Sequence, residues 1–254
     1  MSYKQKKWRS KNAIEIAEYH TARYGAPGQK RKEKKMPTPE EMEKINQYTR
    51  ERTARLKLRQ WFEVHDYFTD LTYRKDARPP DMDAAKKHFQ KFIRKVRKEY
   101  KKRGAVLRWM RNIEVGIKNA WHIHLIVNRI PETDVILASA WEHGRVTNQL
   151  MYAVGEFRKL ANYITKTPKT DKRLRESDYS ASRNMPIKKP EEKIFFHWKT
   201  FGRFEDPKDR DPIDKDYHVR IPKGFYLDKE SYHEGINPWG YPYRTYTLLR
   251  IRRE

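Results

Sequence analysis

The sequence predicts an α+β protein with an antiparallel sheet of about five strands and helices packed on one face of that sheet. Three observations lead to this fold class: short apolar strands at 64–73 and 106–115, an amphipathic helix from about 83 to 101 between them, and an apolar hairpin at 113–127. The order strand, helix, strand, strand, helix is typical of helices packed against an antiparallel sheet. The opposite face of the sheet is then free for a partner.

The hairpin consists of two short apolar strands joined by a tight connection that contains Gly116, Lys118 and Asn119. Side chains alternate between the two faces of a strand. Two histidines therefore share one face, while the apolar residues between them share the face that packs on a core: His122 and His124 on the first, and Ile123, Leu125 and Val127 on the second.

Glu114 lies eight positions before His122, so a turn about Lys118 places the two opposite each other on partner strands. Two neutral imidazoles and one carboxylate suit a divalent metal ion that keeps positions open for substrate. The sequence therefore predicts a metal site at Glu114, His122 and His124. The alternative is a half-exposed strand face without a ligand.

A helix predicted from Gln149 to Lys166 carries the second candidate. Its apolar residues recur at steps of 4, 3, 4 and 3, at Leu150, Val154, Phe157, Ala161 and Ile164. Tyr163 lies off this stripe, and Lys166 lies three residues later, where its ammonium can approach the phenol oxygen. The alternative is an aromatic residue packed at the edge of the helix.

Taken together, these elements resemble the HUH endonuclease superfamily, and within it the rolling-circle replication initiators of bacterial plasmids and phages. The resemblance lies in the pair His122 and His124, the acid upstream, and a helix that ends in LANYITK at 160–166. FTDLTY at 68–73 matches the first motif of the family. WEHGRV at 141–146 and SASRN at 180–184 are also similar, so the likeness runs from about 61 to 196.

This resemblance implies a ferredoxin-like or RRM-like nuclease fold and a metal-assisted tyrosine transesterification. Tyr163 is then the nucleophile that forms a 5′-phosphotyrosine link with single-stranded or origin DNA, aided by Lys166. Glu114, His122 and His124 hold Mg²⁺ or Mn²⁺. No Gly-x-x-x-x-Gly-Lys-Ser/Thr loop is present, so we expect a separate helicase and polymerase as partners.

The sequence departs from some relatives, which carry two nucleophilic tyrosines at a short spacing on one helix. Tyr152 is eleven residues before Tyr163, about 16 Å along a helix, so the sequence indicates a one-tyrosine enzyme. A transposase or a conjugative relaxase is an alternative, although relaxases typically have a third histidine where Glu114 stands. A further alternative is a non-enzymatic, basic nucleic-acid-binding protein.

The composition favours a polyanionic partner. The 254 residues carry 58 Lys and Arg against 34 Asp and Glu, a net charge of +24, and cationic side chains release counterions from phosphate backbones. There is no apolar run long enough to span a membrane and no secretory leader, so we expect no membrane partner and a cytoplasmic location in a bacterial cell, encoded by a plasmid, phage or mobile element. The absence of cysteine excludes disulfides and zinc–thiolate sites.

We expect three segments: a basic arm and helix at 1–60, the endonuclease domain at 61–200, and an aromatic and basic extension at 201–254 packed on or near that domain. The arm is predicted to contain a short helix at 12–24 and a longer helix from Thr38-Pro39 to about Gln60. Residues 170–193 are predicted to form a long loop, followed by strands at 194–198 and 245–251.

Five residues are candidates for DNA contact outside the catalytic cluster. Three of them belong to the basic face of the helix at 83–101, namely Lys87, Lys91 and Arg94, and the other two, Arg183 and Asn184, belong to the polar segment at 170–193. A solvated helix face and an ordinary surface loop are the respective alternatives.

Overall fold

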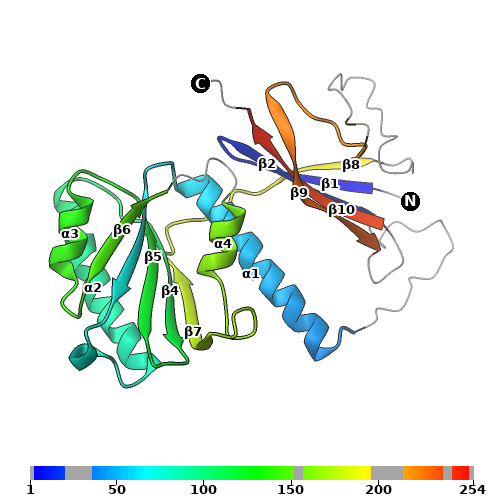
Figure 1. Cartoon of the computed structure of the whole chain (residues 1–254). Helices are drawn as coiled ribbons and strands as arrows, with labels where there is room; N and C mark the ends of the chain where they lie inside the picture. Colours follow the sequence, from blue (N-terminus) through cyan, green and yellow to red (C-terminus); the bar gives the residue numbers. More distant parts are fainter. Residues whose placement is uncertain are drawn as a thin grey trace. The chain divides into compact units, whose positions relative to one another are not determined.

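The computed structural model describes residues 3–20, 36–151, 157–195, 214, 216–236 and 242–251. Contacts divide the chain into two compact units, Gln47–Ile187 and the combination of Met1–Asn46 with Lys188–Glu254 (Figure 1). Helix α1 (Pro39–Trp61) runs from one unit into the other. This division differs from the three consecutive segments that we expected, because the two ends of the chain contribute to one unit. None of the described helices is both long and apolar enough to cross a membrane.

The unit Gln47–Ile187 confirms the predicted fold class. Its five strands are all paired antiparallel in the order β6-β3-β5-β4-β7. Their bounds are β3 Tyr67–Thr72, β4 Trp109–Gly116, β5 Trp121–Val127, β6 Val146–Leu150 and β7 Leu174–Ala181. The helices are α2 (Met82–Lys102), α3 (Thr133–Ala140) and α4 (Arg158–Ile164), with a 3-10 turn at Lys75–Ala77.

One face of this sheet packs on α2 and α3. Ile113, Ile123 and Leu125 are fully buried on this face, where they join Phe89 and Phe92 of α2 in one apolar cluster. The alternation of a strand then directs the intervening residues of β4 and β5 to the opposite face. The histidines of β5 are among them.

The opposite face is covered only in part. Ala54 and Leu58 of α1 and Ala161 of α4 join Met110 and Ile126 of the sheet in a second apolar cluster. Helices α2 and α3 thus lie on one side of the sheet and α4 on the other (Figure 1). The expectation of a face left free of helices is correct only for the end of the sheet that carries His122.

Both predicted helix starts are confirmed. The side chain of Asp81 accepts a hydrogen bond from the backbone N–H of Ala84, 2.7 Å, at the start of α2. At the start of α1, Thr38 Oγ1 accepts from the N–H of Glu41 and Glu41 Oε2 accepts from the N–H of Thr38, which is a capping box.

The predicted helix from Gln149 to Lys166 is wrong at its first half. Residues 146–150 form strand β6, which pairs with β3 so that Tyr67 lies opposite Leu150, and the helix α4 is limited to Arg158–Ile164. Backbone pairing with the edge of a sheet outweighs a helical pattern of apolar residues at this position. Tyr152 lies outside the described residues.

The loop predicted at 170–193 is also wrong, because it contains β7 and β8 (Glu191–Phe195). Strand β7 pairs with β4 at the edge of the sheet, with Ser177 opposite Glu114. An edge strand exposes much of its surface, so its polar composition hides it from a search for apolar alternation. Strand β8 covers only the first part of the strand predicted at 194–198, and residues 196–198 lie outside the described residues.

The second unit is built from both ends of the chain. Its antiparallel sheet has the order β8-β1-β2-β10-β9, with the further strands β1 Tyr3–Arg9, β2 Ala13–His20, β9 Phe225–Ile236 and β10 Pro242–Arg250. Residues 12–20 are therefore strand where we predicted a short helix, because Ile14 and Ile16 of β2 lie opposite Leu248 and Tyr246 of β10 and share an apolar core with them. The strand predicted at 245–251 is confirmed by β10.

The segment after α3 is docked on the end of β3 by its backbone. Thr72 donates its N–H to Arg145 O, 2.9 Å, and accepts from Trp141 Nε1 at 3.0 Å. A Cβ atom added to Gly144 would lie 2.1 Å from Thr72 O, which is backbone and cannot rotate away. Only glycine allows this approach.

We predict that Gly144→Ala lowers the free energy of unfolding by at least about 2 kcal/mol, because the new methyl group forces the backbones of the loop and of β3 apart. Urea unfolding measures this loss. Gly116→Ala is the matched control, since its added Cβ meets no atom closer than 3.7 Å. Equal stabilities for the two variants would contradict the packing described here.

Candidate active site

The predicted hairpin is confirmed, and its register aligns the candidate residues. Glu114 of β4 lies directly opposite His122 of β5. On the other side of β5, strand β3 places Asp70 opposite His124. Directly opposed side chains of antiparallel strands share a face. Two carboxylates and two imidazoles therefore meet on the face that α4 covers in part.

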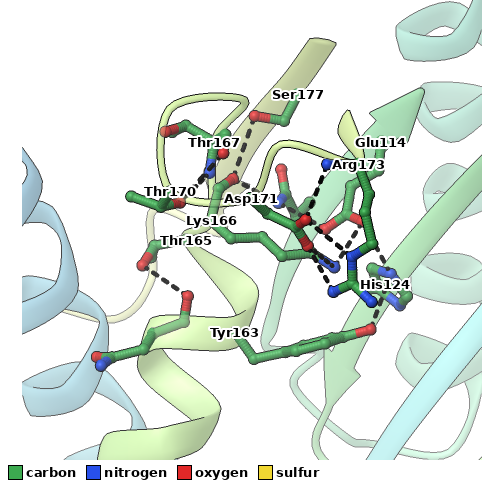
Figure 2. Close-up of polar contacts among 12 residues, drawn as sticks. Glu114, His124, Tyr163, Thr165, Lys166, Thr167, Thr170, Asp171, Arg173 and Ser177 are labelled. Carbon is green, nitrogen blue, oxygen red and sulfur yellow. Dashed lines mark hydrogen bonds and ion pairs between the residues drawn. The ribbon is translucent and has the colours of Figure 1, made fainter. Parts of the chain in front are cut away.

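His124 is the centre of this group. Its Nδ1 is hydrogen-bonded to Asp70 Oδ1, and its Nε2 lies 3.2 Å from Glu114 Oε2 and 3.2 Å from the hydroxyl of Tyr163 (Figure 2). Asp70 therefore orients the imidazole, and Nε2 is the ring atom that faces the tyrosine. The sequence analysis included Asp70 in the FTDLTY strand but assigned it no role.

The two histidines have opposite electrostatic environments. Burial alone lowers the pKa of His124, but its hydrogen bonds with Asp70 and Glu114 outweigh burial and raise that pKa. The pKa of His122 is lowered, first by burial and then by the nearby charge of His124. The two rings are nearly parallel, at 8°, with centroids 6.4 Å apart. His122 is therefore the ring that stays neutral, the state in which an imidazole binds a metal ion.

Glu114 is a charge held inside the protein, with only 2% of its surface exposed. Lys166 Nζ lies 2.9 Å from Glu114 Oε2, and Asn112 Nδ2 donates to Glu114 Oε1 at 3.0 Å. We predicted that the ammonium of Lys166 approaches the phenol oxygen. It lies 4.2 Å from the centre of the Tyr163 ring instead, with Glu114 as its ion-pair partner. Lys166 thus neutralises a buried carboxylate.

The turn after α4 adds two residues that the sequence analysis missed. Asp171 Oδ2 lies 3.8 Å from Lys166 Nζ and accepts a hydrogen bond from Arg173 Nη2 at 2.8 Å, while Arg173 Nε donates to Asp171 Oδ1 at 2.9 Å. Figure 2 shows Arg173 beside Glu114 and His124. The hydrogen bonds with Arg173 hold the pKa of the Asp171 carboxyl far below its usual range. Nothing but two opposite charges in a polar stretch marked these residues in the sequence.

Tyr163 is the most accessible member of the cluster, with 40% of its surface exposed. Its ring packs edge-on against Phe68, whose ring also stacks on His124. Burial of the phenol, followed by the charges of Glu114 and Asp70, raises the pKa of Tyr163 to about 12, and the charge of Arg173 opposes this rise. The phenol is therefore protonated until more positive charge reaches it.

The donor set fits a divalent cation in kind, and one pair fits in spacing. Two atoms that each bind one ion at about 2.0–2.2 Å lie about 3.0–3.5 Å apart when the angle between the bonds is near-octahedral or near-tetrahedral. His124 Nε2 and Glu114 Oε2 are 3.2 Å apart. His122 is not closed on this pair, and among the described residues no group of three His, Cys, Asp or Glu side chains is close enough together to hold an ion as it stands.

The five candidates for DNA contact lie away from this cluster. Asn184 Nδ2 donates to the backbone oxygen of Leu107 at 3.0 Å, a structural role at the far end of β7, and its neighbour Arg183 is exposed. Lys87, Lys91 and Arg94 are exposed on α2, which covers the other face of the sheet. The structure thus brings together Glu114, both histidines, Tyr163 and Lys166, and leaves the other five candidates outside.

We predict that Asp70→Asn lowers the pKa of His124 in the metal-free protein, because the amide supplies no negative charge for the imidazolium. A raised folded-state pKa stabilises the protein below the unfolded-state pKa of about 6.5, and this contribution is lost as pH rises through the folded-state pKa. The variant should therefore lose more stability below about pH 6.5 than at alkaline pH.

NMR titration of the imidazole signals, with urea unfolding at two pH values, measures both effects. His88 is the internal control, because burial and Lys91, not Asp70, lower its pKa. An unchanged pKa of His124 in Asp70→Asn would contradict the role given to Asp70.

The comparison with curated proteins gave no match to this chain. A solved structure of the N-terminal nuclease domain of minute virus of mice non-structural protein 1 aligns over 77% of this chain and 72% of that chain, at 13% identity. Its TM-score of 0.16 is too low to establish a common fold. The work on that domain concerns Zn²⁺ coordination in its active-site pocket and DNA recognition at the origin of replication. Residues 66–168, which include Asp70, Glu114, His122, His124, Tyr163 and Lys166, match the family model of the replication-associated protein ORF2.

Proposed function

We propose that the unit Gln47–Ile187 is a replication initiator endonuclease of the HUH, one-tyrosine class, which nicks and rejoins single-stranded origin DNA in rolling-circle replication. The observation that carries this proposal is the contact of 3.2 Å between the Tyr163 hydroxyl and His124 Nε2, inside a cluster that also holds His122 and Glu114. The match of residues 66–168 to replication-associated proteins supports it.

In the proposed reaction the oxygen of Tyr163 attacks the phosphorus of one phosphodiester. The bond from phosphorus to the 3′ oxygen breaks, which leaves a 5′-phosphotyrosine on the protein and a 3′-hydroxyl on the DNA. The exposed phenol loses its proton to water, and the departing 3′ oxygen takes a proton from water. The reverse attack by a 3′-hydroxyl rejoins the strand without a nucleotide cofactor, because the covalent link conserves the phosphodiester.

His122, His124 and Glu114 are the residues that would hold a divalent metal ion, Mg²⁺ or Mn²⁺. When bound, such an ion polarises the scissile phosphate and stabilises the charge that develops on its oxygens. Asp70 keeps the His124 ring oriented, and Lys166 with Asn112 keeps the Glu114 carboxylate in place. Strand separation and synthesis would fall to a separate helicase and polymerase.

Arg173 is the residue that we assign to the substrate phosphate. Its side chain is 83% exposed, and its bidentate contact with Asp171 uses Nε and Nη2, so the Nη1 end of the fork carries none of that contact. A guanidinium held in a fixed orientation by a carboxylate suits a phosphate oxygen in geometry and charge. The same positive charge lowers the pKa of the attacking phenol.

We predict that Tyr163→Phe forms no denaturant-stable adduct with a single-stranded origin oligonucleotide in the presence of Mn²⁺ or Mg²⁺, while its DNA affinity changes little. Gel electrophoresis detects the adduct, and mass spectrometry of the DNA-linked peptide identifies the attached residue. Tyr152→Phe is the matched control and keeps the adduct. An undiminished adduct in Tyr163→Phe, or a linked peptide without Tyr163, would refute the assignment.

We further predict that Arg173→Ala lowers the rate of the cleavage step about 10- to 100-fold, the size of a lost charge-assisted hydrogen bond. Arg173→Lys should keep part of the rate. The discriminating substrate has a neutral methylphosphonate at the scissile position, where the arginine has no anionic oxygen to bind. On this substrate the two variants and the natural protein should differ much less than on phosphate. An equal loss on both substrates would assign Arg173 a structural role only.

A further inference from the structure

The helix α2 carries a row of cations on the face that points away from the sheet. Lys87, Lys91, Arg94 and Lys98 follow one another at steps of 4, 3 and 4 residues and are all exposed. At about 100° per residue these four side chains fall within an arc of about 60°, and they extend about 16 Å along the helix. We call these four residues the α2 stripe.

The stripe lies opposite the buried side of the helix. Met82, Phe89, Ile93 and Val96 of that side pack in the apolar cluster beneath the sheet, centred about 180° around the helix axis from the stripe. The catalytic cluster is on the other face of the same sheet. A DNA segment that contacts the stripe is therefore separate from the segment at Tyr163, with the sheet between them.

The charge on the stripe is not balanced within the described residues. Residues 84–98 contain seven Lys and Arg and no Asp or Glu. Neighbouring cations of the helix have acidic partners, as in the pairs of Lys86 with Asp178 and Lys95 with Glu142, whereas no ion pair involves the stripe in the part of the chain that the structure describes. Like charges three and four residues apart destabilise a helix by themselves. An external polyanion removes that penalty.

The shape and composition of the stripe select among polyanions. A single strand is held mainly by stacking of its bases on exposed rings, and the aromatic residues of α2, namely Phe89, Phe92 and Tyr100, are all buried. Membrane surfaces bind basic helices that also insert apolar side chains, and no large apolar side chain of α2 is exposed. What remains is contact with phosphates alone, and a duplex presents one charge per about 1.7 Å of its axis.

We infer that the α2 stripe binds the backbone of duplex DNA, and that the unit Gln47–Ile187 holds a double-stranded arm of its substrate on this face while a single strand is cleaved on the other. The inference rests on the proposed function for the second strand-bearing face only. Phosphate contacts carry no base sequence, so the stripe contributes affinity equally on any duplex.

The test compares Lys87→Ala/Lys91→Ala/Arg94→Ala/Lys98→Ala with the natural full-length protein in binding to a fluorescent, mixed-sequence duplex at several NaCl concentrations without divalent cations. Each lost phosphate contact lowers the slope of log affinity against log salt by about 0.9, so we expect the slope to fall by about 3 to 4. The loss should be the same on a second duplex of unrelated sequence. Lys87→Arg/Lys91→Arg/Lys98→Arg should keep the original slope.

The control removes the same charge elsewhere, in Lys44→Ala/Lys75→Ala/Lys223→Ala/Lys229→Ala, four exposed positions that are spread over the chain. An unchanged slope in the stripe variant, or an equal fall in this control, would overturn the inference. A stripe variant that keeps duplex affinity but loses binding to phosphatidylserine vesicles would also overturn it, in favour of a membrane surface. Because no cleavage is measured, failure here leaves the tyrosine adduct untouched, and a missing adduct leaves the salt slope untouched.

Discussion

The buried carboxylate of Glu114 is the constraint on which the catalytic face depends. An ionised group with 2% exposure is stable only when other groups satisfy it, and here an ammonium, an amide and an imidazole do so. Removal of one partner from such a buried pair typically costs about 3–5 kcal/mol. The positions of α4, of the turn after it and of β5 are thus tied to one carboxylate. Ser177 and Asn112 add to this by donating hydrogen bonds to the backbone oxygen of Lys166.

The charges around this carboxylate alternate in sign along a connected row. Asp70 contacts His124, Glu114 lies between His124 and Lys166, and Asp171 lies between Lys166 and Arg173 (Figure 2). Tyr163 sits beside this row with a raised pKa, because the nearest charges are carboxylates. In this arrangement the phenol stays neutral, and positive charge brought to the row shifts it toward phenolate.

The two faces of one sheet are thereby given different chemistry. Alternation along β4 and β5 sends apolar side chains to α2 and α3 and ionisable side chains to the side of α4. Helix α2 repeats this separation, since its buried side completes the core and its outer side is cationic. The second unit has its own core and its own buried ion pair, in which Arg244 donates to Glu18 and Tyr246 adds a hydrogen bond at 3.2 Å. It lies outside the residues that match the replication-associated family.

The sequence by itself determined the features that depend on local order: the fold class of the main unit, the capped starts of α1 and α2, and the hairpin that pairs Glu114 with His122. Each of these follows from spacing within a few residues, which is where side-chain alternation and capping act. Only the tertiary structure decided that 146–150 is a strand, that the chain ends form a sheet together, and that Asp70, Asp171 and Arg173 join the cluster. Those outcomes depend on pairing between segments far apart in the chain, and a polar edge strand or a charged turn carries no local pattern that reveals its partner.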